Sequence, residues 1–505
     1  MATPADKLAQ SLDALKTLQD AKAVAIRASD LSRVHRERLL KNGFIREVMK
    51  GWYIPVRPDG PAGESTGWYA SFWSFCAAYL TERFGEDWCL GAEHSIALHT
   101  GNWNVPRQLL VRATRGGNKP TGLLHDTSIF DLRLEVPPPQ DIQLIDGLRV
   151  MRLPAALIAC APGHFAAHPV EMRSALATIT DASDVLGRLL DGGHSSIAGR
   201  LAGAFRNIGR NQIAETISAT MKAAGYTVNE IDPFSDRPPV AIGQRETSPA
   251  VNRLRMSWAE MRGAVLERFP PAPGLPADVT AYLHQVDDGY ATDAYNSLSI
   301  EGYRVSAELI ERARSGNWNP DNGADREHQD ALAARGYWQA FQNVKDTLSR
   351  ILQGANAGDA TQTDHGTWYR EMFGPSVAAG ILKPADLAGY RSGPVFIRQS
   401  MHVPPRSEAV RELMPAFFDL LREEREASVR VVLGHFFFVN IHPYFDGNGR
   451  MGRFLMNAML ASGGYPWTVV SLAQRTRYMN ALEAASIGRD IRPFADLLAE
   501  LAGPG

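Results

Sequence analysis

The stretch HPYFDGNGRMGR, residues 442–453, decides how the rest of this chain is interpreted. It places an imidazole, a carboxylate, two glycines flanking an amide, and two guanidinium groups within one short segment. The apolar run after Arg450 predicts a helix, so the glycine turn lies at a helix N-terminus. Unpaired N–H groups and the helix dipole favour anions there. The stretch therefore predicts a phosphate-binding turn beside a group that accepts a proton.

The turn and the first part of the helix supply the donors. Gly447 and Gly449 let backbone N–H groups close on an oxyanion without a Cβ in the way. Asn448, between them, is expected to add its side-chain amide as a donor. Arg450 and Arg453 are three residues apart on the predicted helix, so both face the same phosphates.

Two side chains before the helix are suited to the chemistry itself. Asp446 is expected to hold Mg²⁺, which prefers one or two carboxylates together with phosphate oxygens. His442 is neutral near pH 7 and is expected to take a proton from an attacking hydroxyl. A lone histidine or a lone glycine turn is usually structural, but a structural loop has no need of both arginines and the amide at this spacing.

This stretch resembles the signature of the Fic family, His-Pro-Phe-x-Asp/Glu-Gly-Asn-Gly-Arg-x-x-Arg, with Tyr444 where phenylalanine is usual. The resemblance implies an all-helical core and transfer of AMP from ATP to a Ser, Thr or Tyr hydroxyl of a target protein. It implies that His442 is the base, that Asp446 holds Mg²⁺ and that the glycine turn with its two arginines holds the phosphates. Relatives that transfer a whole phosphate carry a lysine and lack the Gly-Asn-Gly-Arg run, which argues against that activity.

A second segment, SLSIEG at residues 297–302, predicts a helix end with Gly302 as its stop signal. It resembles the family's inhibitory motif, Ser/Thr-x-x-x-Glu-Gly/Asn, which implies roles for Ser297 and Glu301. A glutamate within reach of Arg453 pairs with it and occupies the partner of the γ-phosphate. The alternative is a solvated or capping glutamate.

A third segment, GYRSGPVFIRQS at residues 389–400, predicts a short β-hairpin in a helical region. It resembles the family's flap, whose exposed edge pairs with the target backbone. The predicted docking edge consists of Val395, Phe396, Ile397 and Arg398. The alternative is a plain connecting hairpin.

Two neighbours of the signature receive different interpretations. His435, on the apolar helix before the turn, is interpreted as a core histidine that supports the site rather than as a catalytic one. Arg475, Arg477 and Tyr478 fall where the family's adenine-side helix begins, so Tyr478 is predicted to bind the nucleotide.

The N-terminal residues form the second informative region. Helical patterns at 6–19, near Ser29 and Asp30, and at 32–41 precede two β-stretches around Lys50, which is the order of a winged helix-turn-helix. From residue 33 to 50 six basic residues stand against two acidic ones, whereas the whole chain has a net charge of −2. The region resembles the winged-helix head of AbiEi-type antitoxins, and DNA contacts are predicted, within residues 29–55, for Arg33, Arg36, Arg38, Lys41 and Lys50. The alternative is a protein-interaction or dimerisation module.

Length and composition limit the number of domains and the location of the protein. The 505 residues allow two to four domains, predicted as residues 1–57, 58–235 and 236–505, with a linker at 233–239. Three cysteines without metal spacing fit a reducing cytosol. The absence of a spanning apolar run or a signal-peptide core predicts a cytoplasmic protein with no membrane contact.

Together these patterns predict a mainly α protein. A C-terminal all-helical Fic domain with a hairpin flap follows an α+β winged helix-turn-helix and a mixed α/β middle region. The first functional hypothesis is an AMP-transferase that uses ATP and Mg²⁺ and is inhibited by Glu301. The second is a DNA-binding regulator or antitoxin whose Fic part senses nucleotide, and the third is removal of AMP with Glu301 activating water. The target, the DNA sequence and homo-oligomerisation stay open.

Overall fold

The computed structural model describes residues 3–21, 23–56, 58, 65–234, 248–316 and 325–503. The chain forms two compact units. Unit 1 consists of residues 1–253 with 396–403, and unit 2 consists of residues 254–395 with 404–505. The predicted linker at 233–239 and the predicted boundary at 235/236 lie largely outside the described residues.

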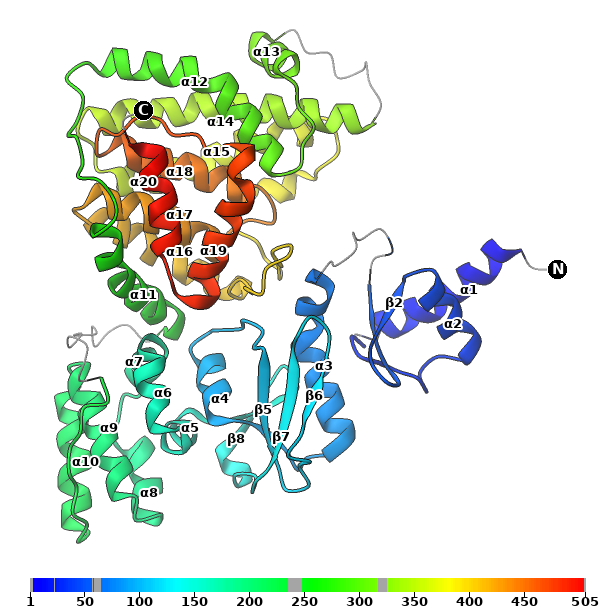
Figure 1. The fold of residues 1–505 in the computed structure, drawn as a ribbon, viewed down its shortest axis with the longest axis vertical. Helices are drawn as coiled ribbons and strands as arrows, with labels where there is room; N and C mark the ends of the chain where they lie inside the picture. The colour runs from blue at the N-terminus through cyan, green and yellow to red at the C-terminus, as the bar shows by residue number, and fades with distance from the viewer. Residues whose placement is uncertain are drawn as a thin grey trace. The chain divides into compact units, whose positions relative to one another are not determined.

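The N-terminal part of unit 1 pairs two helices with a small sheet (Figure 1). Its elements are α1 (Pro4–Asp20), β1 (Ile26–Arg27), α2 (Arg33–Lys41), β2 (Ile45–Met49) and β3 (Trp52–Pro55). The three antiparallel strands are arranged in the order β1-β3-β2. The predicted hairpin is confirmed, and Ser32 caps α2 by accepting from the N–H of His35.

The predicted short helix near Ser29 and Asp30 is wrong. Asp30 accepts a hydrogen bond from the N–H of Arg27 at 2.8 Å, and its own N–H donates to the Arg27 carbonyl at 3.0 Å. These bonds close a turn directly after β1. A side chain that was expected to start a helix satisfies the backbone behind it instead, as aspartate commonly does in turns.

The rest of unit 1 is a mixed α/β region, as predicted. A four-stranded sheet in the order β4-β5-β7-β6 contains one parallel pair, β5 with β7, and a separate hairpin joins β8 to β9. Aromatic side chains of α3, including Trp68, Phe72 and Phe75, form much of the core beside the sheet. The elements are α3 (Thr66–Phe84), β4 (Cys89–Leu90), α4 (Ala92–His99), β5 (Gln108–Ala113), β6 (Pro120–Gly122), β7 (Ser128–Arg133), η1 (Pro139–Asp141), β8 (Ile142–Ile145), β9 (Leu148–Met151), α5 (Leu153–Ala159), α6 (Pro162–Ala167), α7 (Pro169–Ala177), α8 (Ser183–Asp191), α9 (Ser195–Asn207) and α10 (Asn211–Ala223).

Helices are the regular secondary structure of unit 2 in its described residues, as predicted for the C-terminal region. Helix α17 is apolar on nearly every face and is therefore buried, with α16, α18, α19 and α20 packed around it (Figure 1). Its helices are α11 (Pro249–Leu266), which begins at the end of unit 1, α12 (Val279–Ile300), α13 (Ala307–Ser315), α14 (Asp325–Leu352), α15 (Ala357–Ala378), η2 (Pro384–Leu387), α16 (Ser407–Glu423), α17 (Ala427–Ile441), α18 (Asn448–Ala461), η3 (Leu472–Gln474), α19 (Arg475–Gly488) and α20 (Arg492–Ala502).

The predicted flap hairpin is wrong, because residues 389–403 contain no strand. The few β-formers are interrupted by Gly393 and Pro394, and the N–H of Ser400 donates to the Ile397 carbonyl in a turn. Without a partner strand the segment is irregular. Its residues 396–403 belong to unit 1, where Met401 and Val403 pack against the core.

Two predictions from composition can be compared with the structure. Cys76, Cys89 and Cys160 are buried free thiols, as expected for a chain without a disulfide framework. In the described ranges no helix has both the length and the apolar character needed to cross a membrane.

Candidate active site

The turn between α17 and α18 holds the predicted histidine and glycines in uncommon backbone conformations. His442 is the C-cap of α17 and lies in the left-handed region, with φ 54° and ψ 59°. Gly447 is the N-cap of α18 with φ 81°, a conformation that only glycine adopts at little cost. The prediction that the glycine turn opens a helix is therefore confirmed.

Asn448 closes this turn with its side chain. Its Oδ1 accepts from the N–H of Tyr444 at 2.9 Å, and its Nδ2 donates to the Tyr444 carbonyl at 2.8 Å. The residue is 1% exposed. The loop itself uses the amide oxygen and one of the two amide N–H groups, and donation to a phosphate stays a prediction. The Tyr444 ring, which replaces the usual phenylalanine, stacks on Tyr369 with ring centroids 3.8 Å apart.

His442 is poised as a neutral base. Its Nδ1 lies 3.2 Å from the Val439 carbonyl. A hydrogen bond to that carbonyl requires the proton on Nδ1 and leaves Nε2 as the acceptor. Burial, helped by the nearby Arg391 cation, lowers the pKa of His442 to about 4, against the hydrogen bond to Val439 and the carboxylates of Glu301 and Asp446. The imidazole is therefore uncharged at neutral pH.

Arg450 is 1% exposed and is held between two aromatic rings. Its guanidinium carbon lies 5.1 Å from the Tyr303 ring centroid and 4.9 Å from that of Phe373. Such contacts with ring faces stabilise a buried cation. Its Nη2 lies 3.3 Å from Asp446 Oδ2.

Asp446 is the one predicted metal ligand, and its side chain is 65% exposed. One carboxylate oxygen accepts from the N–H of Gly447 at 2.6 Å, which orients the group. Within the described ranges no group of three His, Cys, Asp or Glu residues could hold a metal by itself. A single oriented and accessible carboxylate nevertheless fits Mg²⁺, which takes its remaining ligands from phosphates and water.

Arg453 is paired with the end of α12, 152 residues earlier in the chain. Its Nη2 donates to Glu301 Oε1 at 2.7 Å and to the Ser297 carbonyl at 3.0 Å, and its Nε donates to Ser297 Oγ at 2.8 Å. Arg453 is 3% exposed, and among the described residues its Nη1 has no hydrogen-bond partner. Burial opposes the charge, but the Glu301 carboxylate, together with Tyr478 and Tyr337, raises the pKa of Arg453.

Glu301 also lies over the start of α18. A Cβ built on Gly449 would overlap Glu301 Oε1, so the carboxylate rests against the bare glycine backbone in the first turn. An anion is favoured at this helix N-terminus, and a carboxylate occupies the place. Glu301 is the C-cap of α12 and Gly302 follows with φ 93°, which confirms the predicted helix end.

Tyr478 does not line an open site. It is 1% exposed, and its hydroxyl lies 2.7 Å from His435 Nε2. The predicted nucleotide contact is not present in this arrangement, because no face of the ring is accessible. His435 is fully buried, as expected for a core histidine.

Sequence reasoning missed Asp293, and it named Arg475 without finding its contact. Asp293, in the middle of α12, accepts from the Tyr337 hydroxyl at 2.7 Å, and burial raises the pKa of this carboxyl to about 6. Arg475 donates to the Ile300 carbonyl at 3.0 Å and so caps the end of α12. Nothing local in the sequence distinguishes these side chains from ordinary helix residues.

The predicted contacts of residues 395–398 with a target protein, and of residues 29–55 with DNA, stay predictions. Val395, Phe396 and Ile397 are half-buried, and Arg398 is exposed. In α2, Arg36 donates to the Ala28 carbonyl and Arg38 to the Lys7 carbonyl, so both have partners within the chain. The other predicted DNA contacts, Arg33, Lys41 and Lys50, are exposed.

Comparison with known proteins gives a family match over the same region, and several curated relatives. The Fic/DOC family profile matches residues 368–460. The protein adenylyltransferase Fic of Nematostella vectensis is 28% identical over 254 residues, which is 50% of this chain and 56% of the relative. That of Drosophila willistoni is 30% identical over 217 residues, 42% of this chain and 40% of the relative. The chain thus spans about half the length of the curated relatives it matches.

A solved structure of Fic-1 from C. elegans covers 62% of this chain and 88% of its own, at 18% identity and a TM-score of 0.37. The family match and the geometry of the site are the stronger observations. Both fall on one segment, since residues 368–460 contain the whole turn from His442 to Arg453. Residues 368–460 of this chain are accordingly a region similar to the Fic/DOC family.

Proposed function

We propose that this chain transfers AMP from ATP to a Ser, Thr or Tyr hydroxyl of a target protein, and that Glu301 inhibits the transfer. The observation that carries the proposal is the Glu301 carboxylate on Arg453 at the N-terminus of α18. An anion already occupies the place where a helix N-terminus and a buried arginine together favour one. The sequence relatives, named protein adenylyltransferase Fic, support the same reaction.

The chemistry assigns one role to each group. The target hydroxyl oxygen attacks the α-phosphorus, and its proton passes to His442 Nε2. The bond from the α-phosphorus to the bridging oxygen breaks, and pyrophosphate leaves with the electron pair. Backbone N–H groups at Asn448 and Gly449 stabilise the phosphate oxygens, as in other oxyanion sites, while the N–H of Gly447 orients Asp446.

The two arginines and the carboxylate complete the site. Arg450 and Arg453 carry the charge that binds the outer phosphates. Asp446 would hold Mg²⁺, which supplies positive charge to the phosphates when bound.

Inhibition follows from competition for Arg453. The Glu301 carboxylate pairs with the same guanidinium that would hold the γ-phosphate, and the two anions repel each other. ATP then binds in a pose in which the α-phosphate is misaligned with the attacking oxygen. A misplacement of about 1 Å can cost on the order of 100-fold in rate.

The test is mass spectrometry of AMP incorporation with ATP and Mg²⁺. It compares the wild type, Glu301→Gly, and Glu301→Gly combined with His442→Ala. Glu308→Gly, an exposed glutamate in the first turn of α13, is the matched control. We expect labelling to rise on the order of 100-fold in Glu301→Gly alone, and to be lost when His442 is also replaced.

No labelling in Glu301→Gly despite bound ATP would refute the transfer activity. Equal labelling in Glu301→Gly and Glu308→Gly would refute the inhibitory role. Removal of AMP by water activated at Glu301 stays a prediction, and incubation of labelled protein with the wild type tests it directly.

A further inference from the structure

Arg391 is a buried arginine that lies next to the catalytic turn. It is 1% exposed, and in the described part of the chain its side-chain hydrogen bonds go to backbone carbonyls. Its Nε donates to the His442 carbonyl at 2.8 Å and its Nη1 to the Gly393 carbonyl at 3.0 Å. Its Nη2 donates to the carbonyls of Pro405 and Ile441.

Its backbone is tied to the same turn. The N–H of Arg391 donates to the Pro443 carbonyl at 2.9 Å. Three consecutive carbonyls, from Ile441 to Pro443, therefore accept hydrogen bonds from this one residue. They include carbonyls at the C-terminal end of α17, where partners inside the helix are missing and a cation is favoured.

The turn that Arg391 holds is the strained one. His442 has φ 54°, an uncommon conformation for a residue with a side chain. Such a conformation persists only where the surroundings determine it. Arg391 bonds to the carbonyl of His442 itself and to those on either side, and so holds the backbone that carries the imidazole.

Burying a guanidinium is costly unless its donors are satisfied. Burial lowers the pKa of Arg391 to about 10, so it still carries its charge at neutral pH. The fork of N–H groups on a guanidinium suits several fixed carbonyls at once, and lysine does not reproduce it. Its remaining bonds, to Gly393 and Pro405, hold the chain on either side of the predicted docking segment.

We propose that Arg391 is a positioning residue for AMP transfer, and that it holds the backbone of the His442 base in a fixed conformation against the chain at Gly393 and Pro405. The inference rests on the proposed function. It assigns to one side chain the task of aligning the base with the attacking hydroxyl.

The test uses the full chain with Glu301→Gly as the active background. Arg391→Met and Arg391→Lys are each added, and AMP incorporation into the chain itself is followed by mass spectrometry. We expect a fall on the order of 100-fold for methionine and about tenfold for lysine. ATP affinity, measured by calorimetry, should change by less than about threefold.

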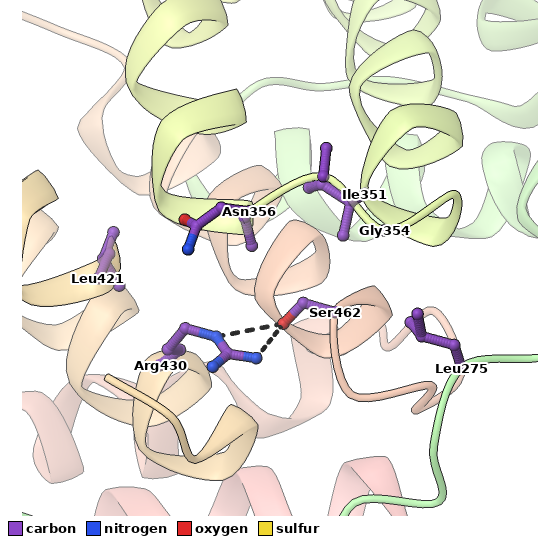
Figure 2. A pocket seen from close by; sticks show the side chains of 9 residues that line it. Leu275, Ile351, Gly354, Asn356, Leu421, Arg430 and Ser462 are labelled. Atoms are coloured by element: carbon purple, nitrogen blue, oxygen red, sulfur yellow. Dashed lines mark hydrogen bonds between the residues drawn. The ribbon is translucent and has the colours of Figure 1, made fainter. Parts of the chain in front are cut away.

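Arg430 offers a matched control at the other end of α17. It donates to the carbonyls of Glu424 and Arg425 and to Ser462 Oγ. Burial lowers its pKa also. It lines a cavity of about 200 Å³ away from His442, between the start of α15 and the end of α18 (Figure 2). Arg430→Met should keep the labelling rate within about threefold of the Glu301→Gly background. Thermal unfolding should show that it loses about as much stability as Arg391→Met does.

A pH profile separates positioning from general destabilisation. His442 is held neutral by burial and by the Arg391 cation, against the carboxylates of Glu301 and Asp446. In the Glu301→Gly background, loss of Arg391 should therefore raise the pKa of His442 and move the acid limb of the labelling profile to higher pH. Arg430→Met should leave that limb in place.

The outcomes are distinct. If the Glu301→Gly background itself does not label, the proposed function fails and the variants are not compared. If it labels and Arg391→Met labels equally fast, or Arg430→Met is equally slow, the positioning role is wrong. If Arg391→Met no longer binds ATP, the comparison is made with Arg391→Lys instead. Labelling by Arg391→Lys at the full rate of the Glu301→Gly background, with the acid limb at the same pH, overturns the inference.

Discussion

Replacing Asp293 by asparagine should change how the stability of unit 2 depends on pH. The Asp293 carboxyl is 3% exposed and accepts a hydrogen bond from Tyr337. Burial raises its pKa from 3.8 to about 6, against the opposing effects of the Tyr337 hydroxyl and the Arg453 cation. Asparagine keeps an oxygen that accepts from Tyr337 but carries no titrating group.

The sign follows from proton binding. Between pH 4 and 6 the folded state binds more protons at Asp293 than the unfolded state does, so the free energy of unfolding falls as pH rises. The pKa difference corresponds to about 3 kcal/mol, at roughly 1.4 kcal/mol for each unit. The carboxyl therefore costs nothing below pH 4, and its full cost is present above about pH 7.

The assay is hydrogen exchange of peptides from α12, corrected for the intrinsic pH dependence of exchange. Between pH 4 and 7 the opening free energy of the wild type should fall by about 3 kcal/mol relative to Asp293→Asn. Asp288→Asn, whose carboxylate on the same helix is 70% exposed, should behave like the wild type. A difference between wild type and Asp293→Asn that does not change with pH would refute the reasoning.

Two further predictions concern the site itself. Gly449→Ala should weaken ATP binding at least about tenfold and also release Glu301 from Arg453, because the new methyl group takes the space of the carboxylate. Calorimetry with ATP measures the first effect, and unchanged affinity would contradict the placement of the phosphates over Gly449. In Glu301→Gly the labelling rate should stay level from pH 8 down to about 6 and fall only at lower pH, since burial lowers the pKa of His442. An acid limb centred near 6.5 would instead show that the imidazole is solvated.

The helical elements of the site were predictable because their signals are local. Gly302 and Gly447 mark a helix end and a helix start through their own backbone freedom, and the apolar run around His435 predicts a buried helix. The prediction of a flap hairpin was wrong because two short runs of β-forming residues make a hairpin only if they pair with each other, and local sequence does not show whether they do. Here Arg391 and Gly393 take part in another set of bonds.

The sequence alone determined which chemical groups stand at the turn from His442 to Arg453, since their spacing is covalent. Only the tertiary structure decided what those groups contact. Glu301 reaches Arg453 across 152 residues and Arg391 reaches the His442 carbonyl across 51. It also decided that the Asn448 amide serves the loop and that Tyr478 is buried. The physical reason is that a buried polar side chain forms hydrogen bonds with the groups that packing places next to it, and packing depends on the whole fold.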